Sequence, residues 1–207
     1  MDRKKSYLLL ASSLLILTGV FLIILSLTDI NRQEQATEQS LTEAKEKVEF
    51  TREQPANPVL QEEQLTDFSF KKGEAIGILE IPRLDAELPI IEGTDEDELE
   101  KGVGHYSSTA LPGQPDQILL SGHRDTVFRR LGELEIGDIF YISMPYGSYS
   151  YEITHTQIVD ANDTTVIQTT APIETLTVST CYPFSFIGDA PDRYVLTALR
   201  INTTMPK

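Results

Sequence analysis

The chain has 207 residues, and 40% of them are hydrophobic, so it is long enough for one ordinary domain with a real core and further segments. Its formal net charge of −15 argues against a nucleic-acid-binding protein, because a phosphate backbone attracts a basic surface and the sequence contains no basic stripe. The single cysteine, Cys181, cannot form a disulfide within the chain, so a disulfide-stabilised scaffold is excluded.

The N-terminal residues predict one membrane-spanning helix. Basic residues at 3–5 precede the uncharged apolar stretch 7–27, which as a helix would be roughly 32 Å long, close to the roughly 30 Å hydrocarbon core of a bilayer. This stretch is longer than the apolar part of a signal peptide and no Ala-x-Ala follows it, so an anchor is favoured over a cleaved signal. The basic residues predict that residues 1–6 lie in the cytoplasm and the rest of the chain outside the cell.

Residues 28–72 are predicted to form an acidic, flexible stalk. Between residues 29 and 70, ten acidic residues stand against four basic ones, Gln and Glu dominate, and Pro55 and Pro58 interrupt the segment. Residues 36–50 have some helical character, but they lack a strong apolar face. Because so polar a segment cannot bury enough apolar surface to fold by itself, we expect a solvated coil that tethers the next domain.

Residues 73–207 are predicted to form a single β-rich domain. Short stretches of alternating apolar and polar residues are separated by Gly and Pro. About eight short strands with only brief helices predict an antiparallel all-β barrel or sandwich instead of βαβ units. A short acidic helix is expected after Thr94 as its N-cap, and a helical turn at 128–131. The expected strands are 75–81, 88–91, 117–121, 139–143, 149–153, 157–159, 175–180 and 194–201.

Cys181 stands where one predicted strand ends, and Arg193 stands where the next begins. A loop between two strands of one sheet brings these ends close together, so we expect the thiol and the guanidinium to point toward one place. A thiol with the ordinary pKa of about 8.5 is only slightly ionised at pH 7, so a nucleophilic cysteine needs a neighbouring base or cation. The alternatives are an inert core cysteine and, for Arg193 beside Asp192, a surface ion pair.

Of the three histidines, His123 is the best candidate for that base. It follows an apolar strand and a glycine, so it stands at the end of a predicted strand, as Cys181 does. Asp125, two residues later, is a minor candidate for orienting the imidazole. His155 lies among threonines and is expected at the surface, whereas His105 is expected in a structural turn. The spacing of the histidines and the cysteine is not that of zinc ligands, so we expect no metal.

Three short motifs resemble those of the sortase family. Residues 177–181, Thr-Val-Ser-Thr-Cys, resemble the sortase signature Thr-Leu-x-Thr-Cys, with Val178 in place of leucine. Residues 122–126, Gly-His-Arg-Asp-Thr, are similar to the histidine motif, and residues 190–194, Ala-Pro-Asp-Arg-Tyr, to the arginine motif. The resemblance covers roughly residues 73–200 and is strongest to the class D sortases of spore-forming Gram-positive bacteria.

The resemblance implies a fold and a set of roles. The fold would be all-β with short helices, an eight-stranded sortase-type barrel preceded by one transmembrane helix. Cys181 would attack the threonine carbonyl of a Leu-Pro-x-Thr sorting signal that continues with Gly or Ala, and form a thioacyl intermediate. His123 would act as general acid and then as general base, and Arg193 would stabilise the oxyanion. Substrate contacts are expected from Thr180, Tyr182 and Ile187.

The resemblance also implies the partners. These would be surface proteins that carry the sorting signal, an amine of a cell-wall precursor of the lipid II type, and the membrane, with the catalytic domain outside the cell. No cofactor is expected. Two other classes stay open from the residues alone. A membrane-anchored cysteine protease or an L,D-transpeptidase-like wall enzyme would use the same thiol, although the latter usually has a Ser-x-Gly-Cys motif. A non-catalytic surface binding module would keep Cys181 in its core.

Overall fold

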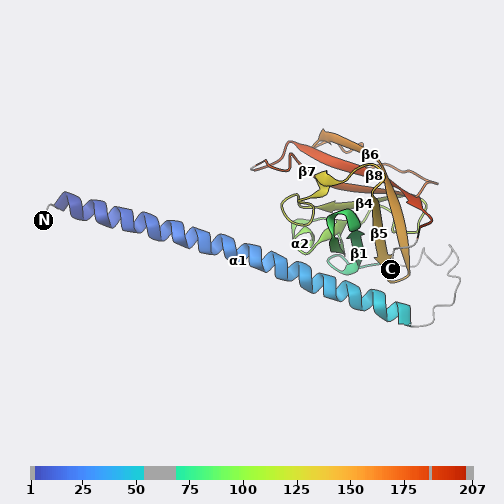
Figure 1. Ribbon diagram of the computed structural model, residues 1–207, viewed down its shortest axis with the longest axis horizontal. Coiled ribbons are helices and arrows are strands. Elements are labelled where there is room, and N and C mark those ends of the chain that lie inside the picture. The colour runs from blue at the N-terminus through green and yellow to red at the C-terminus, as the bar shows by residue number, and fades with distance from the viewer. Residues whose placement is uncertain (1–2, 54–68, 187, 204–207) are drawn as a thin grey trace. The chain divides into compact units, whose positions relative to one another are not determined.

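The computed structural model describes residues 3–53, 69–186 and 188–203. The chain divides into two units, Met1–Ala36 and Thr37–Lys207. Eight strands and four helical segments follow one another along it (Figure 1). They are α1 (Arg3–Glu53), β1 (Ala75–Ile81), η2 (Pro82–Leu84), β2 (Ala86–Glu92), α2 (Glu96–Leu99), β3 (Val103–His105), β4 (Gln117–Gly122), η3 (Leu131–Glu133), β5 (Ile139–Met144), β6 (Gly147–Asp160), β7 (Thr175–Tyr182) and β8 (Asp192–Ile201).

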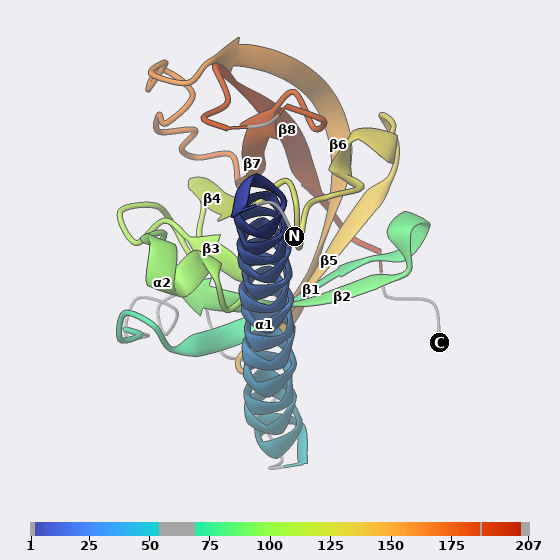
Figure 2. The same cartoon turned by 90° about the vertical axis from the view of Figure 1, so that its left-hand side faces the viewer.

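The strands form a closed barrel in the order β1-β2-β3-β4-β7-β8-β6-β5, which Figure 2 shows from the side. The predicted eight-stranded barrel is therefore confirmed. The expectation that all strands are antiparallel was wrong for two pairs, because β2 runs parallel to β3 and β4 runs parallel to β7. Parallel neighbours need long crossover connections, and the β5–β6 hairpin lies within the one between β4 and β7.

The alternation that predicts the strands also builds the core. In β7, Leu176 and Val178 are fully buried inside the barrel, so Ser179 and Cys181 point to its outer face. The other strands contribute a continuous apolar interior in the same way. Its largest buried side chains include Ile76, Leu79, Ile90, Ile118, Leu120, Phe128, Phe140, Ile142 and Tyr151.

Some elements differ from the predictions. The strands expected at 149–153 and 157–159 are parts of one 14-residue strand, β6, whose polar second half continues the ladder with β8 after an irregularity between Ile153 and His155. Strand β3 was not expected because three residues are too few for a visible alternation. The N-cap of α2 is Asp95 instead of Thr94, and the helical turn lies at η3 instead of 128–131.

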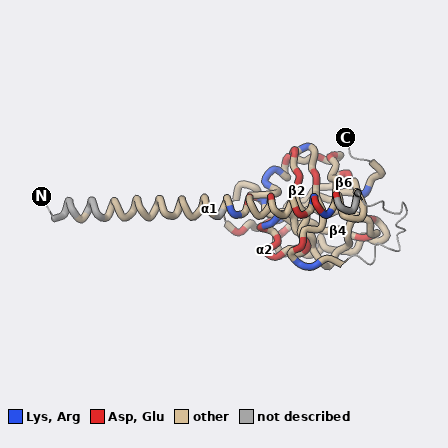
Figure 3. The backbone as a smooth tube through the Cα atoms, turned by 90° about the horizontal axis from the view of Figure 1, so that it is seen from below, with Lys and Arg blue, Asp and Glu red and all other residues tan. Residues whose placement is uncertain are grey.

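The described part of the N-terminal unit is the first part of helix α1, up to Ala36. Within Ala11–Glu49 this helix is long and apolar enough to cross a membrane, by length and composition. Its described apolar part appears in Figure 3 as a stretch without basic or acidic residues. The predicted anchor of residues 7–27 lies within α1.

The second unit begins with the last part of α1, and here the structure differs from the predicted flexible stalk. Residues 37–53 are helical, and Ala44 is fully buried against Ala75, Ile78 and Ile91 of β1 and β2. Leu41 and Val48 are partly buried beside it, at the spacing that places residues on one helix face. This apolar face is small, which is why composition alone did not indicate it. The stalk residues 54–68 lie outside the described residues.

Two ion pairs accompany this packing at the rim of the contact. Nζ of Lys45 lies 2.6 Å from Oε2 of Glu87 in β2, and Nζ of Lys47 lies 2.9 Å from Oε1 of Glu74, just before β1. Lys47 also donates a hydrogen bond to the carbonyl oxygen of Ala75. The helix is thus joined to the outer face of β1 and β2 by apolar burial and by lysines.

Candidate active site

Three neighbouring strands place the predicted catalytic residues side by side. β4 is parallel to β7 with Gly122 beside Thr180, so His123 and Cys181 each come one residue later in the same direction. β8 is antiparallel to β7, and Cys181 pairs directly with Arg193. Residues that are 58 and 12 positions apart in the chain therefore meet at one end of one three-stranded part of the barrel.

The outer face of this end holds a pocket of about 420 Å³. The structure brings His123, Cys181 and Arg193 together in its wall, as predicted, and Asp125 lies there too. Cys181 is half-buried, on the side of β7 opposite to the core, which contradicts the alternative of a core cysteine. The described residues that line it are His123, Arg124, Asp125, Ala161, Cys181, Gly188, Asp189, Ala190 and Arg193.

The guanidinium of Arg193 lies against its own loop. Its Nη1 donates to the carbonyl oxygens of Ala190, at 3.3 Å, and Asp192, at 3.0 Å. Among the described residues Arg193 forms no ion pair, so the alternative of a surface pair with Asp192 is not found. Its Nε and Nη2 donors make no hydrogen bond within the described part of the chain, and Arg193 is one of the residues that line the pocket.

The turn that carries His123 is held by close packing at Gly122. A Cβ atom on Gly122 would lie 2.6 Å from the ring of Phe128, which is fully buried. The backbone N–H of Phe128 donates to the carbonyl oxygen of His123, at 3.0 Å, and closes the turn. Asp125 accepts hydrogen bonds from Arg129 through its backbone carbonyl, and in the described residues its carboxylate has no hydrogen bond to His123.

The predicted substrate contacts do not all lie in this pocket. Thr180 is only 3% exposed, and its Oγ1 donates to the carbonyl oxygen of Gly122 at 2.7 Å, which joins β7 to β4. Tyr182 points to the other side of β7 from Cys181 and lines a second pocket. Ile187 lies outside the described residues. A substrate contact by these three residues stays a prediction.

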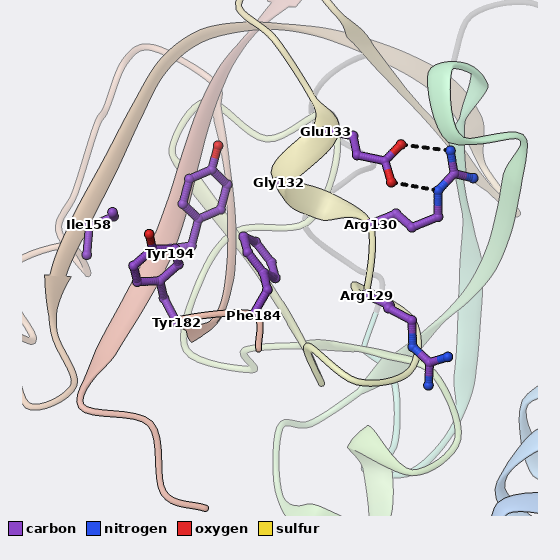
Figure 4. Close-up of a pocket in the computed structure, with 8 residues that line it drawn as sticks. All are labelled: Arg129, Arg130, Gly132, Glu133, Ile158, Tyr182, Phe184 and Tyr194. Carbon is purple, nitrogen blue, oxygen red and sulfur yellow. Dashed lines mark hydrogen bonds and ion pairs between the residues drawn. The ribbon is translucent and has the colours of Figure 1, made fainter. Parts of the chain in front are cut away.

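The second pocket, also of about 420 Å³, contains an aromatic cluster (Figure 4). The ring of Phe184 is 5.7 Å from that of Tyr182 and 5.4 Å from that of Tyr194, centroid to centroid. At the opposite side of the pocket the guanidinium of Arg130 forms a bidentate ion pair with Glu133. Its Nε is 2.9 Å from Oε1 and its Nη2 is 2.8 Å from Oε2. Phe184 and Tyr194 pack against the barrel core, and Cys181 is not among the described residues that line this pocket.

A third pocket, of about 320 Å³, lies further along the outer face that carries Cys181. Thr177, Val195 and Thr197 form part of its floor, and the chain at 163–170 forms its roof. That roof is held by Gln117, whose amide bonds the backbone at Val166 and Gln168. The outer face therefore carries a groove covered by residues 163–170, in addition to the reactive pocket.

The other histidines lie elsewhere. His105 is buried in β3, where Nδ1 is 2.7 Å from Oε2 of Glu92 and Nε2 is 3.0 Å from the carbonyl oxygen of Ala110. It is structural as expected, but it lies in a strand instead of a turn. His155 is exposed on β6, as expected. Within the described ranges, no group of three His, Cys, Asp or Glu side chains is placed to hold a metal ion.

Sequence reasoning gave no role to Arg124. This residue lies between His123 and Asp125 and contacts the loop after Cys181 through three backbone carbonyls. Its position in the histidine motif was the only available signal, because a long-range contact from a side chain to a loop leaves no pattern in the sequence.

Comparisons with known proteins agree with this geometry. Residues 79–201 match the family model of the sortase domain. Sortase D of Bacillus subtilis (strain 168) is 50% identical over 167 residues, which cover 80% of this chain and 84% of that protein. A Clostridium perfringens sortase D5 transpeptidase has a similar solved structure, with a TM-score of 0.67, 28% identity and coverage of 81% of this chain and 99% of that one. A sortase C1 from Streptococcus suis has a TM-score of 0.59, 29% identity and coverage of 64% and 75%.

Proposed function

The chain belongs to the sortase family of cysteine transpeptidases, and from this premise we propose that it cuts Leu-Pro-x-Thr sorting signals after the threonine and transfers the surface protein to a cell-wall amine. The observation that carries the proposal is the meeting of Cys181, His123 and Arg193 in one pocket on the outer face of β4, β7 and β8. The thiol, a base and a fixed cation are the three groups that acyl transfer through a thioester needs.

The first step forms the thioester. Cys181 Sγ, as the thiolate, attacks the threonine carbonyl, and the amide C–N bond breaks. Protonated His123 gives its proton to the leaving amine, which departs with the C-terminal part of the signal. The negative charge that develops on the carbonyl oxygen is met by the guanidinium of Arg193, which lines the pocket and has Nε and Nη2 donors that hold no hydrogen bond among the described residues.

The second step transfers the acyl group. The incoming amine attacks the thioester carbonyl, neutral His123 takes a proton from that amine, and the C–S bond breaks to release Cys181 as the thiolate. Cys181 is then again a thiolate and His123 is again protonated, as at the start of the first step. If water took the place of the amine, the same pocket would hydrolyse the signal, so acceptor choice separates a protease from a transpeptidase.

The residues before the threonine of the signal have a natural place along β7. The groove over Thr177 and Val195 lies on the same face as Cys181, and four strand residues span about 13 Å. That length matches a short extended peptide of about four residues. We place the Leu-Pro part of the signal there, under the chain at 163–170.

The membrane anchor completes the proposal. Residues 7–27 hold the chain in the membrane with residues 1–6 in the cytoplasm, so the catalytic domain meets secreted substrates outside the cell. The support is the apolar stretch of α1 and the basic residues before it.

The test uses the full chain in detergent with peptides that contain Leu-Pro-x-Thr-Gly or Leu-Pro-x-Thr-Ala. Intact-mass spectrometry should detect a thioacyl adduct, absent in Cys181→Ala, which a small primary amine resolves into an amide product. The preferred peptide reports the residue after threonine. An enzyme that stays folded, with a reactive thiol, and forms no adduct with either peptide would refute the proposed signal. An adduct that only water resolves would make the protein a protease.

A further inference from the structure

Arg124 connects the two segments that carry the reactive residues. Its Nη2 donates to the carbonyl oxygens of Phe186, at 2.7 Å, and Gly188, at 2.8 Å, and its Nη1 donates to that of Pro183, at 3.2 Å. The guanidinium also lies over the ring of Phe186, 5.9 Å from the centroid. One side chain from the β4–β5 segment thus holds the first half of the β7–β8 loop at three points.

Only arginine can make this set of contacts. The three carbonyl oxygens are spread along the loop, and a planar guanidinium offers five donors in a fixed fork. A lysine in its place would present one nitrogen at the end of a flexible stem. Arg124 also lines the reactive pocket, but both of its terminal nitrogens are engaged with the loop, so we assign its contribution to the reaction to the loop that it holds.

The loop that Arg124 holds forms one wall of the reactive pocket. Gly188, Asp189 and Ala190 line the pocket beside Cys181. The same loop leads into β8, and the carbonyl oxygen of Ala190 accepts a hydrogen bond from Arg193. The contacts therefore run from Arg124 through the loop backbone to the guanidinium that would meet the oxyanion.

We propose that Arg124 is a positioning residue for acyl transfer, which holds the β7–β8 loop so that the pocket wall and Arg193 stay in place over Cys181. The inference rests on the proposed function of this pocket. Rate losses of about a hundredfold follow when a catalytic group is displaced by about 1 Å, because the reacting groups must be held in a near-attack geometry. Loosening this loop should therefore lower the rate of acylation, while access to the thiol is kept.

The test compares Arg124→Ala and Arg124→Lys with a matched control in full-length protein in detergent. Arg130→Ala is the control, because Arg130 lies in the same segment and also donates to a distant carbonyl oxygen, that of Leu84 at 2.9 Å, away from the reactive pocket. Single-turnover acylation at several peptide concentrations gives a maximal rate and a half-saturation concentration. Alkylation of Cys181 by iodoacetamide reports the thiol alone, and thermal unfolding reports the fold.

We expect Arg124→Ala to lower the maximal acylation rate by about 10- to 100-fold. Alkylation should stay within about twofold of the unmodified protein, and Arg124→Lys should recover part of the rate because it can bind one carbonyl. Arg130→Ala should acylate as the unmodified protein does. Hydrogen exchange at the backbone amides of 184–186 should become faster in Arg124→Ala only.

The other outcomes are distinguishable. If the unmodified protein forms no adduct, the proposed function fails before Arg124 is tested. If it does and Arg124→Ala acylates at the same maximal rate, the positioning role is refuted. A change in half-saturation alone would make Arg124 a substrate-binding residue, and parallel losses of acylation, alkylation and melting temperature would make it merely structural. Both results overturn the proposal.

Discussion

Cys181 and Arg193 are direct partners in the antiparallel ladder between β7 and β8. Such partners carry their side chains on the same face of the sheet, with Cβ atoms about 4.5–5.5 Å apart. The spacing between the Cβ atoms of Cys181 and Arg193 is therefore set by two hydrogen-bonded strands, and contacts with Ala190 and Asp192 hold the guanidinium. His123 has a looser attachment, because it is the first residue after β4 and belongs to a turn.

Replacement of Arg193 should impair the reaction and leave the thiol intact. Removal of one oxyanion donor typically costs about 10²–10³-fold in rate, so Arg193→Ala should lose about that much in kcat/KM for peptide acylation. Arg193→Lys should stay well below the unmodified enzyme, because an ammonium lacks the planar fork. Peptide acylation followed by mass spectrometry measures this. Equal losses in iodoacetamide alkylation would show instead that Arg193 acts on the cysteine itself.

Gly122→Ala should disturb the turn that carries His123. Its new Cβ would meet the ring of Phe128 at 2.6 Å, so the ring or the backbone must move. We expect a loss of about 1–3 kcal/mol in the free energy of unfolding, as for overpacked cores, together with slower acylation. Thermal unfolding and single-turnover acylation measure the two effects.

A second substitution tests the cause of that loss. Phe128→Leu in the Gly122→Ala background should recover part of the acylation rate, because the smaller side chain leaves room for the methyl group. If the double variant were as slow as Gly122→Ala alone, the collision with Phe128 would not be the reason for the glycine.

The buried pair of Glu92 and His105 should make stability depend on pH. Burial raises the pKa of Glu92, but hydrogen bonds from His105 and Ser107 outweigh it, and the pKa lies below its usual value. A lowered pKa in the folded state means that the stabilisation is complete above the unfolded value of about 4.3 and is lost as the pH falls through the folded value. Melting temperature should therefore decrease between about pH 5 and pH 3.

Glu92→Gln tests this contribution. At neutral pH we expect it to lower the free energy of unfolding by about 1.5–3 kcal/mol, the usual value of a hydrogen bond to a charged group. The difference between Glu92→Gln and the unmodified protein should shrink as the pH falls. A difference that stays constant from pH 7 to pH 3 would mean that ionisation of Glu92 does not matter for folding.

The docked part of α1 predicts a further stability effect. Ala44 is fully buried against β1 and β2, so Ala44→Glu should lower the free energy of unfolding by about 1–3 kcal/mol or undock the helix. Thr42→Glu is the control, because it adds the same charge on the exposed side of the same turn. Thermal unfolding and protease cleavage within 37–53 distinguish the two. Acylation should change little, because none of the described residues of 37–53 lines the reactive pocket.

Local pattern was sufficient for much of the fold and for the expected meeting of Cys181, His123 and Arg193; their catalytic roles stay predictions. The bounds of β1, β4, β7 and β8 were predicted to within two residues, and Cys181 and Arg193 stood at predicted strand ends. The parallel pairing of β4 with β7 was not predictable by pattern, because it joins residues 58 positions apart and its direction depends on the connection between them. The position of His123 beside Cys181 agrees with the prediction because it too stands at a strand end.

Features that depend on contacts between distant segments were missed. The docking of 37–53 depends on Ala44, with Leu41 and Val48 partly buried beside it. So small an apolar face gives the helix little amphipathic pattern in the sequence. The contacts of Arg124 are with backbone carbonyls, which every residue has, and no spacing rule indicates them. That Tyr182 lies on the opposite face from Cys181 follows from the alternation of strand residues, and its predicted contact with the substrate stays a prediction.

The half-exposed thiol of Cys181 stands alone in the chain. When an oxidant converts such a thiol to the sulfenic acid, a second cysteine in the same protein can capture it as a disulfide and keep it recoverable. This protein carries no second cysteine. Reactivation of the oxidised enzyme therefore depends on a thiol supplied by another molecule, and where none is present further oxidation to the sulfinic acid ends its activity for good.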